Sequence, residues 1–244
     1  MTEYLHLADV RILLWLNHSL AQHPMLYRSA LWLTDTGGDV AVLLTAAALW
    51  LWPWDRRQLG ITELRRESRA RLLTFGAAGI AAYVTARLIA LGFDAPRPFA
   101  TFLPVRGPVG VFEGLRTFGT FPSDHAALLG ALPPAIARWS SPLGAVWLVT
   151  ALVLIVVRVA VGFHYPWDML AGALIGAAFS LAAMAIFDRH GAVYYYANRV
   201  AAGFSRKPTA YFLYAGLALI GIEFAMHFSH VLWLVLALRS LVAS

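Results

Sequence analysis

The chain has 244 residues, of which 60% are hydrophobic and only 13% are charged, and it carries a formal net charge of +6. An ordinary soluble domain has about 25% charged residues, so this composition excludes a soluble globular protein and predicts an integral membrane protein. The absence of cysteine excludes disulfides, thiolate catalysis and cysteine-ligated metal sites.

Apolar runs along the chain predict an all-α fold, a polytopic transmembrane helical bundle of about six spans in a single membrane domain over residues 1–244. Residues 1–35 mix apolar and polar positions at roughly helical spacing, with a break at His23-Pro24. They are too polar to span a bilayer, so we expect helices that lie in the membrane interface. A first span is expected over residues 40–54.

A charged linker is expected over residues 55–71, and several apolar runs follow it. Further spans are expected over residues 72–93, 123–139, 143–161 and 167–187, with a final span and tail over residues 209–244. Residues 72–187 are therefore the expected catalytic core. Pro133-Pro134 should kink the span that contains them. The loop over residues 94–121 is rich in Gly, Pro and Phe, and its length predicts a lid or a collar that contacts lipid.

Positive charge is distributed unevenly between the predicted loops. Arginines cluster after the first and fifth spans, and Arg138 follows the third. The positive-inside rule places these segments in the cytoplasm, so we attribute the basic charge to topology and lipid headgroups rather than to nucleic acid. Polar residues after the second span, at the start of the third and between the fourth and fifth then converge on the extracytoplasmic face.

Three clusters of polar and ionisable side chains lie at those positions. They consist of Arg97; of Ser123, Asp124 and His125; and of Arg158, His164 and Asp168. Ionisable groups at membrane depth are costly unless they are paired, and they therefore indicate function. Arginine presents forked N–H donors that match phosphate oxygens, and the free N–H groups of a helix start favour an anion. Two histidines supply one group to attack phosphorus and one to protonate the leaving oxygen.

His164 and Asp168 are four residues apart, in the turn between the fourth and fifth predicted spans. Asp168 is placed to accept the imidazole N–H of His164 and to set its tautomer. The other ring nitrogen is then left as a nucleophile or a base. The alternative is a buried, hydrogen-bonded histidine that has only a structural role at a helix start.

The stretch Pro122-Ser123-Asp124-His125, with Arg97-Pro98 before it and Arg158-x5-His164-x3-Asp168 after it, resembles the motifs of the type 2 phosphatidic acid phosphatase (PAP2) superfamily. The likeness includes the order of the motifs relative to the spans. It implies a phosphohistidine mechanism without a metal or another cofactor. In that mechanism His164 is the nucleophile, Asp168 orients it, and His125 is the general acid. The phosphate-binding residues that the resemblance implies are Arg97, Arg158 and Ser123.

Two positions depart from the pattern of that family. The first motif usually opens with a lysine seven residues before the arginine, and this chain has Ala90 there. Arg87 is the expected substitute in phosphate binding, because it lies nearly one helical turn earlier on the same face; the alternative is an interfacial anchor. Asp124 replaces the usual glycine of the second motif. We expect its carboxylate to point away from a bound phosphate, and an aspartate here is common in undecaprenyl-diphosphatase-like members.

The predicted function is metal-independent hydrolysis of a lipid phosphate or diphosphate. The favoured reaction is the conversion of undecaprenyl diphosphate to undecaprenyl phosphate. The alternatives are a phosphatidic acid or phosphatidylglycerophosphate phosphatase, a lipid phosphotransferase, and a non-enzymatic membrane transporter or scaffold. The expected partners are the lipid substrate and the bilayer. The expected location is the inner cell membrane, with a multi-pass chain and an extracytoplasmic active site.

Overall fold

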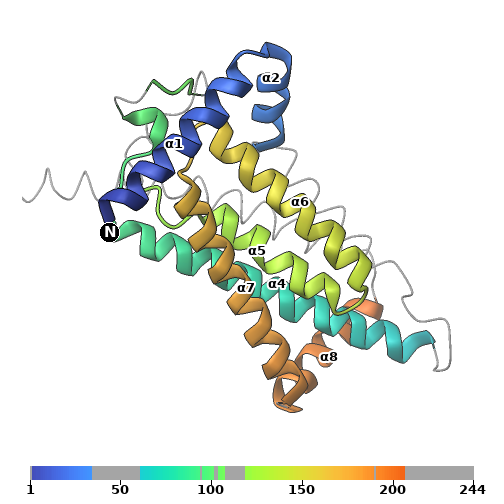
Figure 1. The fold of residues 1–244 in the computed structure, drawn as a ribbon. Helices are drawn as coiled ribbons and strands as arrows, with labels where there is room; N and C mark the ends of the chain where they lie inside the picture. The colour runs from blue at the N-terminus through green and yellow to red at the C-terminus, as the bar shows by residue number, and fades with distance from the viewer. Residues whose placement is uncertain are drawn as a thin grey trace, which may run out of the picture. The chain divides into compact units, whose positions relative to one another are not determined.

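The computed structural model describes residues 2–34, 61–93, 95–101, 104–107, 119–189 and 191–206. All regular elements within these residues are helices (Figure 1). The chain divides into two compact units, Met1–Asn198 and Arg199–Ser244, and the candidate site lies in the first. The expected first span, the final span and tail, and residues 108–118 of the expected lid lie outside the described residues.

Two helices, α1 (Thr2–Ala21) and α2 (Pro24–Trp32), form the N-terminal part of the chain. The break between them at His23 confirms the predicted one, and Pro24 begins α2 because a helix start needs no backbone N–H from that residue. Trp15 and Met25 are 69% and 75% exposed. Such exposed apolar side chains fit helices in the membrane interface, a location that stays a prediction.

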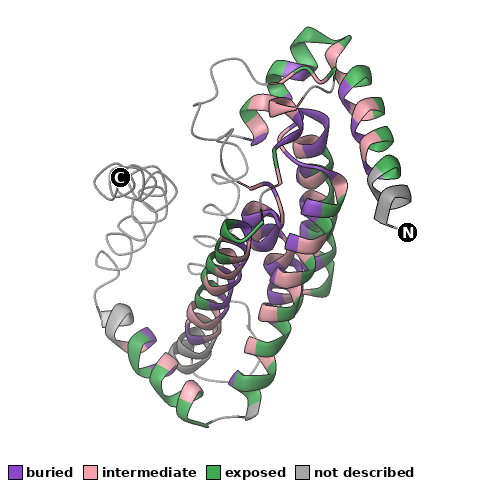
Figure 2. Cartoon of the chain, turned by 90° about the vertical axis from the view of Figure 1, so that its left-hand side faces the viewer, coloured by how far each residue is buried: buried purple, intermediate pink, exposed green. Residues whose placement is uncertain are grey.

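Four helices pack into the central bundle: α4 (Ile61–Leu91), α5 (Asp124–Ala137), α6 (Ser141–Ala160) and α7 (Pro166–Arg189). The short helix α5 contacts each of the other three. Buried residues face the interior of this bundle, and exposed residues face outward from it (Figure 2). A further helix, α8 (Gly191–Arg206), follows α7 along the chain.

The described residues contain three helices that are long and apolar enough to cross a membrane: Arg69–Leu91, Ser141–Ala160 and Pro166–Asp188. They correspond to the second, fourth and fifth predicted spans. The predicted third span is instead the 14-residue helix α5. At about 1.5 Å per residue it is shorter than the roughly 30 Å hydrocarbon core, so by itself it does not have the length of a full span.

The charged linker predicted over residues 55–71 was wrong for its second half. Residues 61–71 are the first turns of α4, which continues to Leu91. This segment contains leucine, glutamate and arginine without glycine or proline, and these residues have good helix propensity. Charge density therefore marked where the apolar stretch begins, but not where the helix begins.

Helices α5 and α7 approach so closely that their backbones touch at residues without large side chains. A Cβ atom added at Gly176 would collide with the backbone carbonyl of Ala127, and one added at Gly130 would collide with that of Ala173. Nearer the start of both helices, the Ser123 N–H donates to the Asp168 carbonyl over 3.0 Å. This contact brings two of the three predicted polar clusters together.

Candidate active site

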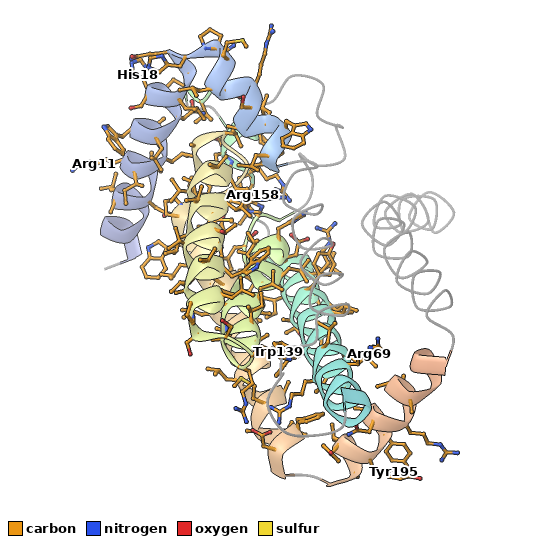
Figure 3. The ribbon with its side chains drawn as sticks, turned by 90° about the vertical axis from the view of Figure 1, so that its right-hand side faces the viewer. Arg11, His18, Arg69, Trp139, Arg158 and Tyr195 are labelled. Atoms are coloured by element: carbon orange, nitrogen blue, oxygen red, sulfur yellow. The ribbon has the colours of Figure 1, made fainter. Side chains whose placement is uncertain are left out.

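The candidate site lies where α4 and α6 end and α5 and α7 begin. Because these helices alternate in direction, these four ends meet at one end of the bundle. Figure 3 shows Arg158 towards this end and Trp139 at the opposite end. The structure thus brings the three predicted clusters to one place, as the motif order suggested.

A tight turn between α6 and α7 presents His164 to the interior. Gly162 has a positive φ of 85°, and a Cβ at this position would lie 2.6 Å from Cγ1 of Val105, so glycine suits both the conformation and the space. The Gly162 carbonyl accepts the N–H of Phe99 over 3.3 Å, which ties the turn to the segment after Arg97. As a result, His164 is only 2% exposed.

The hydrogen bonds of the His164 ring determine its tautomer. Nδ1 lies 3.1 Å from the backbone carbonyl oxygen of Thr120, and a carbonyl can only accept a hydrogen bond. Nδ1 therefore carries the hydrogen of the neutral ring. Nε2 keeps its lone pair, which is the property that a nucleophile requires.

The predicted direct hydrogen bond between His164 and Asp168 was wrong. His164 Nδ1 is 3.7 Å from Asp168 Oδ2, which is too long for such a bond. The Thr120 hydroxyl instead donates to Asp168 Oδ2 over 2.6 Å and lies 2.9 Å from His164 Nδ1. Asp168 Oδ2 also accepts the backbone N–H of Tyr165 over 2.8 Å. Thr120 thus occupies the space between the histidine and the carboxylate, and connects them.

Nε2 of His164 faces two predicted phosphate ligands. Arg97 Nη1 lies 3.2 Å from it and Ser123 Oγ lies 3.4 Å from it. The Ser123 hydroxyl also caps α5 by accepting the Ala126 N–H over 3.3 Å. Arg97 donates through Nη1 to the Phe163 carbonyl over 3.3 Å, whereas its buried Nε has no hydrogen-bond partner among the described residues. A buried, unpaired N–H of a cation next to a histidine lone pair suits an anionic group.

The environment keeps His164 neutral. Burial lowers its pKa to about 4, and the positive charge of Arg97 acts in the same direction, while Asp168 opposes both. Burial also lowers the pKa of Arg97 to about 10, which leaves its guanidinium charged at neutral pH. The site therefore pairs a neutral imidazole with a permanent cation, the combination required to attack a phosphoryl group.

A second histidine, His125, lies at the start of α5 beside a carboxylate of its own. Asp124 Oδ1 is 2.7 Å from His125 Nδ1, and Asp124 Oδ2 is 3.2 Å from Nη1 of Arg87 on α4. The Tyr83 and His125 rings meet in a T-shaped contact, with centroids 6.4 Å apart and planes at 73°. Arg87 is thus engaged with Asp124, and its expected contact with phosphate stays a prediction.

Of two further arginines, Arg158 lies near the predicted site and Arg106 does not. Arg158 is half-buried at the end of α6 and donates through Nη2 to the Thr34 carbonyl over 2.7 Å. Its positive charge acts on both His164 and Arg97, so it lies near the proposed nucleophile, and its role in phosphate binding stays a prediction. Arg106 points elsewhere, because its guanidinium lies over the Tyr27 ring and donates to the Ala21 carbonyl.

Thr120 is the site residue that the sequence analysis missed. It is 2% exposed, lies three residues before Ser123, and is 44 residues from His164 along the chain. The one available signal was a hydroxyl residue directly before the Phe121-Pro122 pair that precedes the second motif. Its backbone N–H donates to the Ala95 carbonyl over 2.9 Å, which holds the loop against the end of α4.

A helical membrane bundle with a buried neutral histidine between an arginine and a serine defines a candidate phosphoryl-transfer protein. Residues 71–192 match the PAP2 superfamily, and the chain belongs to this family. The solved structure of the first transmembrane PAP2 type phosphatidylglycerolphosphate phosphatase from Bacillus subtilis has a similar fold. Its TM-score is 0.53 at 17% identity, over 77% of this chain and 88% of that one.

The curated relatives include an undecaprenyl-diphosphatase and a lipid A 1-phosphatase. The undecaprenyl-diphosphatase BcrC of Bacillus subtilis (strain 168) is 30% identical over 158 residues, which cover 65% of this chain and 73% of that protein. The lipid A 1-phosphatase of Rhizobium johnstonii is 37% identical over 83 residues, which are 34% of each chain. The match thus spans about a third of the length of the lipid A 1-phosphatase.

Proposed function

We propose that this protein hydrolyses a lipid phosphate or diphosphate through a phosphohistidine on His164, without a metal ion. The observation that carries the proposal is the environment of His164 Nε2. Nε2 lies 3.2 Å from Arg97 Nη1 and 3.4 Å from Ser123 Oγ, while Nδ1 donates to the Thr120 carbonyl. A nucleophile and the donors for a phosphoryl group thus occupy one buried position.

In the first step, His164 Nε2 attacks phosphorus and the bond from phosphorus to the leaving oxygen breaks. The electron pair of that bond goes to the leaving oxygen, and His125 donates a proton to it. Arg97, Arg158 and Ser123 stabilise the charge on the equatorial oxygens. The lipid alcohol or lipid monophosphate then departs.

In the second step, water attacks the phosphohistidine. His125 now accepts a proton from this water, the bond from phosphorus to Nε2 breaks, and its electron pair returns to the ring. Asp168, acting through Thr120, stabilises the positive charge that the His164 ring carries from the first step until this bond breaks. Inorganic phosphate is the second product, and both histidines regain their starting protonation states.

We propose undecaprenyl diphosphate as the substrate, supported by the match to BcrC over nearly three quarters of that protein. A lipid A 1-phosphate is the second candidate, supported by the shorter match to the Rhizobium johnstonii enzyme. The remaining alternatives are phosphatidic acid, phosphatidylglycerophosphate, and transfer of the phosphoryl group to a second lipid.

We further propose a single domain of about six spans in the inner membrane, with the site on the extracytoplasmic face.

Phosphate release from the purified protein in detergent tests this function. Undecaprenyl diphosphate should give the highest kcat/KM in a panel with lipid A, phosphatidic acid and phosphatidylglycerophosphate, and activity should persist in EDTA. His164→Ala should lower the rate to less than about a hundredth, because alanine removes the nitrogen that attacks phosphorus. Phosphate gained by a lipid acceptor without free phosphate would instead establish the transferase.

A further inference from the structure

The second histidine of the site has a carboxylate partner of its own. Asp124 is 5% exposed and directly precedes His125, and its Oδ1 lies 2.7 Å from both the backbone nitrogen and Nδ1 of His125. An ionised carboxylate only accepts hydrogen bonds, so Nδ1 of His125 is the donor. The proton that His125 exchanges in catalysis must therefore be on Nε2.

Helix α4 holds this pair from the other side. Arg87 Nη1 lies 3.2 Å from Asp124 Oδ2, so both carboxylate oxygens are engaged. Tyr83, four residues before Arg87 and on the same face of α4, makes a T-shaped ring contact with His125. The Arg87 cation also offsets the negative charge that Asp124 would otherwise present to a phosphate.

We propose that Asp124 is a positioning residue, which holds His125 with Nδ1 protonated and Nε2 directed at the leaving oxygen, and which Arg87 fixes in place. The inference rests on the proposed function of His125 as general acid. Through His125, Asp124 then acts on cleavage of the bond to the leaving group and on the later attack by water, and kcat/KM reports the first of these steps alone. Removal of Asp124 should lower kcat/KM in proportion to how much the leaving oxygen needs a proton.

Two substrates with different leaving groups test this role. The leaving group of dodecyl phosphate is an alkoxide, which needs a proton from the general acid. The leaving group of p-nitrophenyl phosphate is a stabilised phenolate, which departs without one. Asp124→Asn should lower kcat/KM on dodecyl phosphate by about 10- to 100-fold and on p-nitrophenyl phosphate by less than about threefold. Asp124→Glu keeps a carboxylate and should recover part of the loss on dodecyl phosphate. Equal losses on both substrates, or no loss on dodecyl phosphate, would overturn the proposal.

Asp188→Asn is the matched control. This carboxylate is 43% exposed near the end of α7, where it pairs with Arg138, so the variant removes the same charge far from the site. Both substrates should be turned over at the wild-type rate. The melting temperature of each variant, measured in the same detergent, should show that all of them are folded.

A double-mutant comparison separates positioning from a merely structural effect. In a His125→Ala background, Asp124→Asn should cause no further loss of kcat/KM on dodecyl phosphate, because its effect acts through the missing ring. Additive losses would overturn the proposal. If wild-type protein releases phosphate neither from undecaprenyl diphosphate and the other lipids of the panel nor from these two substrates, the proposed function fails together with this inference. If wild-type protein is active and His164→Ala is not, absence of the leaving-group difference refutes the role of Asp124 alone.

Discussion

His164 is a candidate nucleophile because its neighbours distinguish its two ring nitrogens. The Thr120 carbonyl accepts from Nδ1, and the Arg97 and Ser123 donors face Nε2. An exposed histidine exchanges between tautomers and is partly protonated near its ordinary pKa of about 6.5. The Thr120 carbonyl fixes the tautomer of His164, and burial beside Arg97 keeps the ring neutral. One nitrogen is therefore prepared for attack.

The pH dependence of the reaction follows from the lowered pKa of His164. The neutral ring is the active form, so activity should persist as the pH falls through 6.5 and decline only as it approaches about 4, the pKa in the folded protein. The measurement is kcat/KM against pH, corrected for ionisation of the substrate itself. An acidic limb centred near 6.5 would show that His164 is not held neutral by its surroundings.

Thr120→Val tests the connection between His164 and Asp168. Valine keeps the shape and the backbone carbonyl but removes the hydroxyl that donates to Asp168 over 2.6 Å. We expect kcat to fall by about 10- to 100-fold, by analogy with partners that orient metal-bound histidines, whereas Thr120→Ser should stay within about threefold of wild type. Thr74→Val, which removes a hydroxyl that donates within its own helix to the Ala70 carbonyl, should leave kcat unchanged. Equal activity of Thr120→Val and wild type would mean that Asp168 acts without this hydroxyl.

At the scale of single residues, the sequence predicted which side chains gather but not all of their bonds. The placement of Arg97, Ser123 and His164 in one site was predictable, because each belongs to a short motif at a predicted span end. The spacing of His164 and Asp168 also suggested a direct bond, which Thr120 interrupts. A side chain inserted from a distant loop leaves no trace in the spacing of the pair that it separates.

At the scale of elements, the site depends on how closely α5 and α7 approach. Ser123 and Asp168 stand at the starts of these helices, and the Ser123 N–H reaches the Asp168 carbonyl over 3.0 Å. Farther along, Gly130 and Gly176 face the backbone of the opposite helix without an intervening side chain. Small residues at a helix contact in a membrane allow the backbones to meet and to gain van der Waals contact.

Gly176→Ala should therefore destabilise the protein and disturb the site from a distance. Its new Cβ would collide with the Ala127 carbonyl, and forced overpacking costs about 1–3 kcal/mol. We expect a lower melting temperature in detergent and a reduced kcat. Gly76→Ala in α4 is the control, because nothing lies within 4 Å of its added Cβ, and it should be neutral or stabilising by up to about 1 kcal/mol. Equal melting temperatures for the two variants would show that α5 and α7 can separate at little cost.

At the scale of the whole described bundle, alternating helix directions place two clusters of charged side chains at opposite ends. The candidate catalytic groups gather at one end. At the other, Asp188 lies 3.4 Å from Arg138 and 3.9 Å from Arg71. The positive-inside rule predicts that this second end is cytoplasmic, which would place the substrate on the outer side of the membrane.

Cysteine labelling tests this orientation, because the chain has no native cysteine. Gly92→Cys lies after α4 near the site, and Ser141→Cys lies at the start of α6; both positions are exposed. A membrane-impermeant thiol reagent added to intact cells should label the first variant alone, and both should react once the membrane is permeabilised. Labelling of Ser141→Cys alone in intact cells would reverse the orientation.

The sequence by itself determined the helical membrane class, the bounds of α6 and α7 to within two residues, and the family, because apolar runs and short motifs are local properties of the chain. Tertiary structure decided that α5 is short and that charged residues 61–71 continue α4. It also decided the partners of His164 and Asp124: Arg97 is 67 residues from His164, and Arg87 is 37 residues from Asp124. Such bonds depend on which helix faces meet when the bundle packs, and residue spacing along one helix carries no information about the rotation of its neighbour.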